Sequence, residues 1–422
     1  MKKLLILGSD FGTIDIAVKA KKLGYYVITA DLMETSPTKE ASDEKWLIST
    51  VDTEELIRLC RVHGINGVIA GASDFNNEKS KIIAQALGLP TPYDNPLAEK
   101  AGNNKRFFKD KCIENGVPVA RDYYLSSETD VDKADISFPV VVKPVDASGN
   151  RGMSYCNNRD ELKNAIKKAF EISHSSTIIV EKELSGPEYA AHYVVKEGEP
   201  YLLYFASEKH EPGQRNNMYS LVSTTSAHLQ QYLVEVNEGI KKVFRQVGCT
   251  NGIAWVECIR DKDGRFYCFE MGYRLGATML YTQYGKVCGF DAIEYLIKYA
   301  MDEPTGDCME LNRYYKEKSS SYHLFMAKSG TISRIEGIER ISCMGNVIID
   351  MPKREGTEVQ PGRHLGVLRI YSVDINDLVN TLSMINEHLR ILDEHGNDML
   401  IHFTDYATLI REEKTGKEQY GC

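Results

Sequence analysis

The chain has 422 residues, of which 42% are hydrophobic and 26% charged, so it is long enough to bury the cores of two to four globular domains. Its net charge of −9 argues against nucleic acid or an anionic membrane as the main partner, although a local basic pocket for a small anion is compatible with it. The apolar run before Gly8 is too short for a signal peptide, and no stretch is long enough to span a membrane. The ten cysteines form no CxxC pair, which argues against a zinc site or a thioredoxin-like motif. Cysteines that are scattered singly fit a reducing cytoplasm best.

The first 95 residues predict a small α/β domain with a parallel sheet. Strands are expected at residues 2–7, Tyr26–Ala30 and Gly67–Ala70, and helices at Ile14–Leu23, Thr53–His63 and Glu78–Leu87. Gly8, Gly12 and Asp31 resemble part of a dinucleotide fingerprint. Their spacing is GxxxG and not GxGxxG, which argues against a nicotinamide site.

Prolines 90, 92 and 96 mark a linker to a two-part central region, 96–185 and 186–305. The first part predicts helices at Asn103–Asn115 and Arg159–Ile172 and strands at Pro139–Pro144 and Thr177–Lys182. The second part predicts strands at Glu188–Val195 and Tyr201–Ser207, a polar loop at Lys209–Tyr219, helices at Leu229–Val247 and Asp291–Tyr299, and a hairpin between these helices. Short strands separated by glycines and a helix at Ile375–Leu392 then predict a small α+β domain over 320–405, and residues 406–422 are expected to form a mobile tail.

The predicted hairpin places two glutamates symmetrically about its turn, Asp263-Gly264, which is the strongest short-range hairpin signal. Counting outward from the turn pairs Ile259 with Cys268 and Glu257 with Glu270. Two carboxylates facing each other on an apolar strand face need a cation between them. Magnesium fits, because it prefers hard oxygen ligands and binds substrate phosphates as well as one or two carboxylates. A solvated hairpin whose glutamates pair with lysines is the alternative.

A second candidate feature is Lys143, which ends a buried strand directly before a loop that contains Gly149 and Gly152. Glycines let backbone N–H groups approach an anion, and the lysine adds a mobile positive charge, so this arrangement suits phosphate. The pattern GxxxxGK[ST] does not occur, which excludes a P-loop. An ordinary β-turn is the alternative.

The hinge around Gly186-Pro187 is the third candidate feature. The preceding strand ends in Glu181-Lys-x-Leu, which offers backbone hydrogen bonds beside an aliphatic side chain for an adenine edge, and Glu188 could accept ribose hydroxyls. By itself this segment could equally be a charged surface turn.

From about Lys105 to Ala300 the chain resembles the ATP-grasp superfamily. The segment EKELSGPEY is similar to the hinge of D-alanine:D-alanine ligases, VVKPVDASGNRGM to the phosphate loop of carboxylate-amine ligases, and EMGYRLGATM to the closing Glu-x-Asn-x-Arg motif. The resemblance implies a pre-ATP-grasp parallel-sheet domain, a two-lobed ATP-grasp domain and a small α+β C-terminal domain. It also implies binding of ATP and Mg²⁺, with Mn²⁺ as a substitute metal.

Transferred by position, the resemblance assigns a role to each motif residue. Lys105 and Lys143, with the loop residues Ser148, Gly149 and Gly152, would hold the ATP phosphates. The adenine would lie against Glu181, Lys182 and Leu184, and the ribose against Glu188. Glu257 and Glu270 would hold magnesium, while Arg274 would hold an acyl phosphate.

The sequence departs from the family pattern at Gly272, where the family has an asparagine metal ligand. Water or a bidentate Glu270 is expected to fill that position, so the chain binds either one or two magnesium ions. In the loop Lys209–Tyr219 only Lys209 resembles the family, and we take it with Arg274 as a candidate catalytic residue. This loop is either a lid over the substrate or an exposed charged loop.

The implied activity is ATP-dependent activation of a carboxylate and its joining to an amine, with release of ADP and phosphate. The C-terminal segments GTISRIEGIER and PKREGTEVQPGRHLGVLRI resemble the extra domain of dipeptide-forming L-amino-acid ligases, which favours amino acids or small peptides as substrates. The alternatives are a purine-pathway or carbamoyl-phosphate-synthetase-like enzyme, and a nucleotide-binding regulator without catalysis. No nucleic-acid or membrane partner is expected, and a homodimer is the default assembly.

Overall fold

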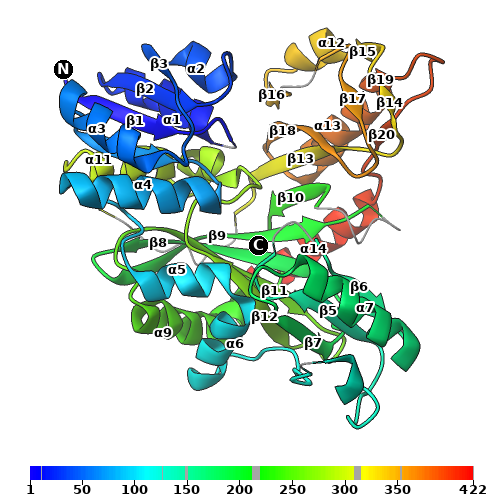
Figure 1. The fold of residues 1–422 in the computed structure, drawn as a ribbon. Coiled ribbons are helices and arrows are strands. Elements are labelled where there is room, and N and C mark those ends of the chain that lie inside the picture. Colours follow the sequence, from blue (N-terminus) through cyan, green and yellow to red (C-terminus); the bar gives the residue numbers. More distant parts are fainter. Residues whose placement is uncertain are drawn as a thin grey trace.

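The computed structural model describes residues 1–10, 12–125, 127–147, 151–211, 219–307, 315–351 and 354–421. The amino-terminal domain and the C-terminal domain lie side by side at the top of Figure 1, the second part of the central region lies below them, and a small lobe formed by the first part lies at the lower right. None of the helices in these ranges combines the length and apolar character needed to cross a membrane.

The amino-terminal domain is the predicted parallel α/β unit, with the strand order β3-β2-β1-β4. Its strands are β1 (Lys3–Leu7), β2 (Tyr26–Asp31), β3 (Glu44–Leu47) and β4 (Gly67–Ala70), and its helices are α1 (Thr13–Lys22), α2 (Pro37–Ala41), α3 (Thr53–His63) and α4 (Asp74–Leu87). Alternate residues of β1 belong to two different cores: Leu4 and Ile6 pack on one face, Leu5 and Leu7 on the other. The continuous apolar run of β1 therefore reflects a strand that is covered on both faces.

The first central lobe contains a three-stranded antiparallel sheet of order β6-β5-β7, covered by a helix. Its elements are α5 (Pro96–Asn103), α6 (Lys105–Glu114), η1 (Glu128–Asp130), β5 (Val140–Pro144), β6 (Ser154–Cys156), α7 (Arg159–Ile172) and β7 (Ile178–Lys182). Asn104 caps α6 by accepting a hydrogen bond from the Phe107 N–H. This cap fixes the start of the helix that carries Lys105.

The second lobe and the C-terminal domain share one nine-stranded sheet. The second lobe consists of β8 (Glu188–Lys196), β9 (Glu199–Lys209), β10 (Leu221–Thr224), α8 (Leu229–Tyr232), the π-helical turn η2 (Leu233–Asn237), α9 (Glu238–Val247), β11 (Gly252–Arg260), β12 (Phe266–Gly272), η3 (Leu280–Gln283), α10 (Tyr284–Cys288) and α11 (Ala292–Ala300). The sheet order is β12-β11-β8-β9-β10-β13-β18-β16, with β20 paired to β13. The short strand β10 pairs with β9 on one side and with β13 on the other. The strands of the predicted C-terminal domain therefore continue the sheet of the second lobe.

The C-terminal domain keeps a hydrophobic core of its own around α13. Its elements are β13 (Lys318–Met326), β14 (Gly330–Thr331), β15 (Arg334–Glu336), α12 (Ile338–Ser342), β16 (Val347–Asp350), β17 (Glu358–Val359), β18 (His364–Ser372), α13 (Ile375–His388), β19 (Arg390–Leu392) and β20 (Leu400–Ile401). The predicted helix Ile375–Leu392 ends earlier than expected, because residues 390–392 pair with β15 as β19.

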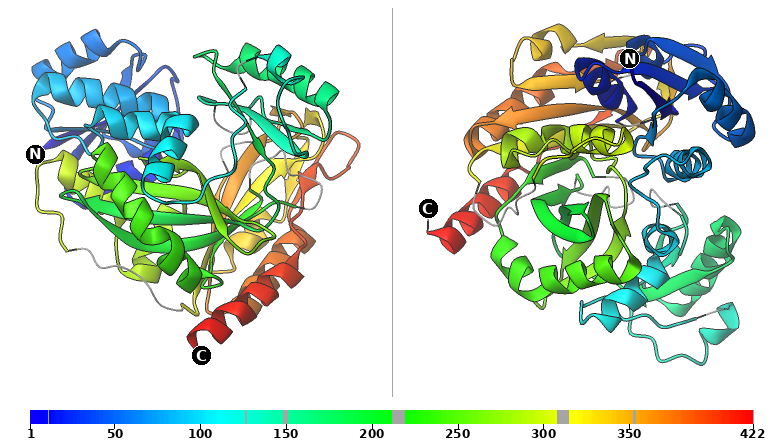
Figure 2. Two further views of the ribbon diagram at one scale, coloured as in Figure 1. Left: turned by 90° about the horizontal axis from the view of Figure 1, so that it is seen from below. Right: turned by 90° about the vertical axis from the view of Figure 1, so that its left-hand side faces the viewer.

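The expected mobile tail is instead a helix, α14 (Tyr406–Tyr420), which packs against the large sheet (Figure 2). Glu413 forms a buried ion pair with Lys318 at 2.6 Å, and Glu412 pairs with Lys209 at 2.5 Å. The charged residues that suggested a solvated tail therefore neutralise lysines of β13 and β9. Local composition could not reveal these partners, because they lie far away in the sequence.

Candidate active site

The hairpin of β11 and β12 brings Glu257 and Glu270 opposite each other, so this predicted pairing is confirmed. The predicted pairing of Ile259 with Cys268 is wrong, because Cys268 lies opposite Cys258. The turn contains three residues, with Gly264 at φ 82° and a hydrogen bond from the Asp261 N–H to the Arg265 carbonyl at 3.0 Å. A β-bulge after Glu257 shifts the register back by one residue, which restores the pairing of the two glutamates.

The neighbouring strands extend this pair into a row of four acids. Ile259 on β11 lies opposite Glu188 on β8, and Glu188 lies opposite Glu208 on β9, so Glu188 and Glu208 share the face of Glu257. Burial, Glu270 and Glu188 raise the pKa of Glu257 to about 8. Burial and the charge of Glu257 also raise the pKa of Glu208 well above its ordinary value. Such a face is stabilised by a bound cation.

Tyr219 lies among these acids, with its hydroxyl 3.0 Å from Glu188 Oε2 and 3.3 Å from Glu257 Oε2. Neither Tyr219 nor Glu208 was predicted as a site residue. The predicted strand Tyr201–Ser207 ends one residue before Glu208, which in the structure belongs to β9 and is buried.

Lys105 connects the first lobe to the β11–β12 hairpin. Its ammonium group lies 3.1 Å from Glu270 Oε2 and donates a hydrogen bond to the Ala147 carbonyl at 2.9 Å. Lys105 therefore lies between a hairpin glutamate and the start of the candidate phosphate loop. Ser148 and Gly149 of that loop lie outside the described residues. Gly152 has φ 77°, and a Cβ there would press against the Pro144 ring.

Glu181 is held by two lysines. Its carboxylate pairs with Lys143 at 2.5 Å and also with Lys109 of α6, and all three side chains are buried. Burial alone would raise the pKa of Glu181, but Lys143 and Lys109 together lower it to about 2. The structure thus brings Glu181 to Lys143, and in this state the carboxylate is engaged by the lysines. Lys109 was not among the predicted site residues.

The backbone of the hinge is also partly engaged. The Lys182 N–H donates to the Arg121 carbonyl at 2.9 Å and the Glu183 N–H to the Pro139 carbonyl at 3.1 Å, while the Lys182 side chain is exposed and Leu184 is half-buried. A Cβ at Gly186 would collide with the Arg260 carbonyl oxygen. Gly186 therefore allows the hinge to pack directly on the end of the β11–β12 hairpin.

Arg274 follows the hairpin and lies at the junction with the amino-terminal domain. Its guanidinium forms a two-pronged ion pair with Asp74 at the start of α4, with Nη2 3.0 Å from Oδ2. The guanidinium also lies over the Trp255 ring, 5.3 Å from its centroid. The two contacts fix the orientation of a cation that is only 12% exposed and is close enough to Glu257 and Glu270 to interact with their charges.

The structure explains the glycine that departs from the family pattern. Trp255 lies opposite Gly272 in the hairpin, and a Cβ at residue 272 would overlap the indole ring. The space of the expected asparagine is therefore filled by Trp255. The indole Nε1 is buried and has no hydrogen-bond partner among the described residues.

Lys209, predicted as catalytic, does not join this cluster. Adjacent residues of a strand point to opposite faces, and Lys209 pairs with Glu412 of α14 while Glu208 faces the acids. Residues 212–218, the centre of the predicted lid, lie outside the described residues.

The described residues fit a metal that completes its coordination with other ligands. Among them, no group of three or more histidine, cysteine or acidic side chains converges as a metal site. Glu257 and Glu270 offer two hard oxygen donors, and magnesium in nucleotide sites takes its remaining ligands from phosphates and water. Burial and the charges of Glu270 and Glu188 raise the pKa of Glu257 although Lys105 opposes this shift, so a further cation would stabilise the pair.

Comparison with known proteins identifies the central region. Residues 136–282 match the family described as ATP-grasp domain. The chain is 23% identical over 352 residues to the carbamoyl phosphate synthase large chain, N-terminal section, of Aquifex aeolicus, with 76% of this chain and 62% of the relative covered. It is 26% identical over 246 residues to the formate-dependent phosphoribosylglycinamide formyltransferase of Prochlorococcus marinus, with 57% and 62% covered. The chain thus spans about three fifths of the length of these relatives.

A solved structure gives a longer match. The L-amino acid ligase from Bacillus licheniformis superimposes with a TM-score of 0.75 at 19% identity, over 93% of this chain and 99% of that one. At this identity the likeness shows a shared fold. Because the ATP-grasp match covers the segment that carries Lys143, Glu181 and both hairpin glutamates, residues 136–282 belong to the ATP-grasp superfamily.

Proposed function

We propose that the protein uses ATP to activate a substrate carboxylate as an acyl phosphate and joins it to an amine, with amino acids or small peptides as substrates. The observation that carries this proposal is the placement of Arg274 by Asp74, next to the Glu257–Glu270 pair. A fixed, buried guanidinium beside a nucleotide site suits a carboxylate and the acyl phosphate formed from it. The fold shared with an L-amino acid ligase over nearly all of that structure supports the choice of substrate class.

The reaction needs no nucleophile from the protein. The substrate carboxylate attacks the γ-phosphate of ATP, ADP leaves, and the amine then displaces phosphate from the acyl phosphate. Lys105 and Lys143 would neutralise the transferring phosphate, and Arg274 would hold the acyl phosphate. The Lys143 ammonium would then contact both the Glu181 carboxylate and the phosphates of the nucleotide.

The remaining assignments concern the nucleotide and the metal. Lys182 and Leu184 would contact adenine, and Glu188, already beside the Tyr219 hydroxyl, would accept the ribose hydroxyls. Glu257 and Glu270 would hold magnesium, with water or a second oxygen of Glu270 in place of a ligand from residue 272. When bound, the metal supplies neutralisation of charge on the phosphate oxygens.

Two other functions compete with this proposal. The curated relatives support a purine-pathway or carbamoyl-phosphate-forming enzyme, since the matches to them cover 76% and 57% of this chain. A regulator without catalysis is disfavoured, because both glutamates, both lysines and Arg274 are present and lie near one another.

Measurement of ADP and phosphate release tests the proposal. The purified full chain is incubated with ATP and magnesium, and amino acids are added singly and in pairs. We expect ADP and phosphate release that depends on a particular pair, with a dipeptide as the second product. Stimulation by bicarbonate or formate, with no response to any amino acid, would favour the competing enzymes. No ADP release with any of these substrates would favour the regulator.

A further inference from the structure

The last two residues of β9 and the two that follow, together the β9 end, lie between the row of four acids and the C-terminal part of the chain. Glu208 lies opposite Glu188 of β8, and His210 has its Nε2 atom 3.8 Å from Glu188 Oε1. Successive residues of an extended strand point to opposite sides. Glu208 and His210 therefore face the acids. The residues that alternate with them, Lys209 and Glu211, face the C-terminal part of the chain instead.

Lys209 and Glu211 are both held by residues of the C-terminal part. The Lys209 ammonium pairs with the Glu412 carboxylate of α14 at 2.5 Å, and the two side chains are only 7% and 13% exposed. The Glu211 carboxylate accepts two hydrogen bonds from Thr404, one from the backbone N–H at 2.8 Å and one from the hydroxyl at 2.6 Å. These contacts fix the β9 end from the side opposite the acids.

The β9 end in turn fixes Tyr219, which links two of the acids. The Lys209 carbonyl accepts a hydrogen bond at 2.7 Å from the N–H of Ser220, the residue directly after Tyr219. The Tyr219 hydroxyl lies 3.0 Å from Glu188 Oε2 and 3.3 Å from Glu257 Oε2. A displacement of Lys209 would therefore move the tyrosine that contacts both carboxylates.

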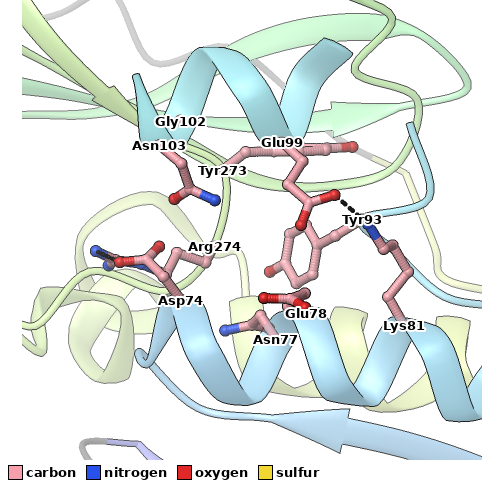
Figure 3. Close-up of a pocket in the computed structure, with 10 residues that line it drawn as sticks. All are labelled: Asp74, Asn77, Glu78, Lys81, Tyr93, Glu99, Gly102, Asn103, Tyr273 and Arg274. Carbon is pink, nitrogen blue, oxygen red and sulfur yellow. Dashed lines mark hydrogen bonds and ion pairs between the residues drawn. The ribbon is translucent and has the colours of Figure 1, made fainter. Parts of the chain in front are cut away.

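The Arg274 guanidinium is another cation of the second lobe that is held from outside the ATP-grasp match. Its partner is Asp74 of the amino-terminal domain, which lies beside it in Figure 3. The Lys209–Glu412 pair is more buried, since the Asp74 side chain is 41% exposed. Loss of one partner from a buried pair leaves an uncompensated charge, so the Lys209–Glu412 pair should hold its lysine firmly.

We propose that Glu412 and Thr404 are positioning residues for the binding of ATP. They hold the β9 end, and through it Tyr219, in the place where the tyrosine hydroxyl fixes Glu188 and Glu257. The inference rests on the nucleotide and metal assignments of the proposed function, in which Glu188 accepts the ribose hydroxyls and Glu257 holds magnesium, and it deepens them. A helix outside the ATP-grasp match would thus control the affinity for the nucleotide.

The test measures the dissociation constant for MgADP by isothermal titration calorimetry, with the full chain and at a temperature where circular dichroism shows each variant to be folded. Glu412→Gln removes the charge that pairs with Lys209, and Glu211→Ala removes the acceptor of both Thr404 hydrogen bonds. We expect each variant to raise the dissociation constant about three- to tenfold, as is typical of residues that act on a site without touching the ligand. Loss of a negative charge by itself would favour an anionic nucleotide, so a weaker affinity has the opposite sign to a simple charge effect. Glu418→Gln, at an exposed position of the same helix, is the matched control and should leave the dissociation constant unchanged.

A double variant separates positioning from direct binding of the nucleotide by Lys209. Lys209→Met combined with Glu412→Leu replaces the ion pair by apolar side chains of similar volume, which should keep α14 packed on β9 and return the affinity close to the wild-type value. A loss as large as that of Glu412→Gln would overturn the positioning role, as would an unchanged dissociation constant for Glu412→Gln and Glu211→Ala. If Glu412→Gln does not fold, Glu211→Ala and the double variant decide the question. If the wild type does not bind MgADP, the nucleotide assignments of the proposed function fail, and this inference fails with them.

Discussion

The buried triad of Lys109, Glu181 and Lys143 allows a sharp test of how the first lobe is stabilised. Substitution Glu181→Gln keeps the size of the side chain and removes its charge. The two ammonium groups, on side chains that are 3% and 9% exposed, then lose the carboxylate with which both form an ion pair. Removing one partner from a buried ion pair typically costs about 3 to 5 kcal/mol, because an uncompensated charge remains buried.

The pKa of Glu181 gives a second estimate of the same quantity. The difference between the ordinary value of 4.5 and the value of about 2 corresponds to roughly 3 kcal/mol of stability at neutral pH. A carboxyl whose pKa is lowered by folding contributes this stability above pH 4.5 and loses it as the pH falls toward 2. The stability gap between wild type and Glu181→Gln should therefore be largest at neutral pH and shrink between pH 4.5 and pH 2.

Urea unfolding of both proteins between pH 7 and pH 3 measures the gap, with hydrogen exchange of β5 and β7 to assign it to the first lobe. Asp132→Asn is the control in the same lobe, since it removes a solvent-exposed ion pair with Lys163 and should leave stability unchanged. A variant Glu181→Gln as stable as wild type at pH 7 would refute the reasoning, as would a gap that does not change with pH.

Three further predictions concern the hairpin and the C-terminal helix. Gly272→Asn should lower the unfolding free energy by about 1 to 3 kcal/mol through overlap with Trp255. In a Trp255→Ala background, which removes the indole ring, the same substitution should cost less; thermal unfolding that shows no loss for the single variant would contradict this. Glu270→Gln should abolish ADP release while the circular dichroism spectrum stays unchanged. Near-normal turnover of this variant would show that Glu270 is not a metal ligand. Deletion of residues 405–422 should lower the thermal midpoint, since it leaves buried lysines of β9 and β13 without partners, whereas a mobile tail could be removed without effect.

The hairpin shows how far local sequence information reaches. The Asp263-Gly264 signal predicted a hairpin and the pairing of Glu257 with Glu270. The pairing is right although the turn has three residues and not two, because the bulge after Glu257 compensates for the extra residue. Bulges depend on how strands pack with their neighbours, so counting from the turn could not reveal this one.

The amino-acid order by itself determined most of the longer strands and helices of the amino-terminal domain and the two central lobes, but not the short strands β3, β6 and β10. Apolar periodicity, glycine and proline positions and helix caps act over a few residues, which are adjacent in the chain. The tertiary structure alone decided which charges meet. Lys109 and Glu181 are 72 positions apart and Asp74 and Arg274 are 200 apart. Likewise, Lys209 meets Glu412 across 203 positions. Such pairs form only where folded elements pack together, and for this reason the sequence predicted candidate site residues but not which of them the fold holds in contact.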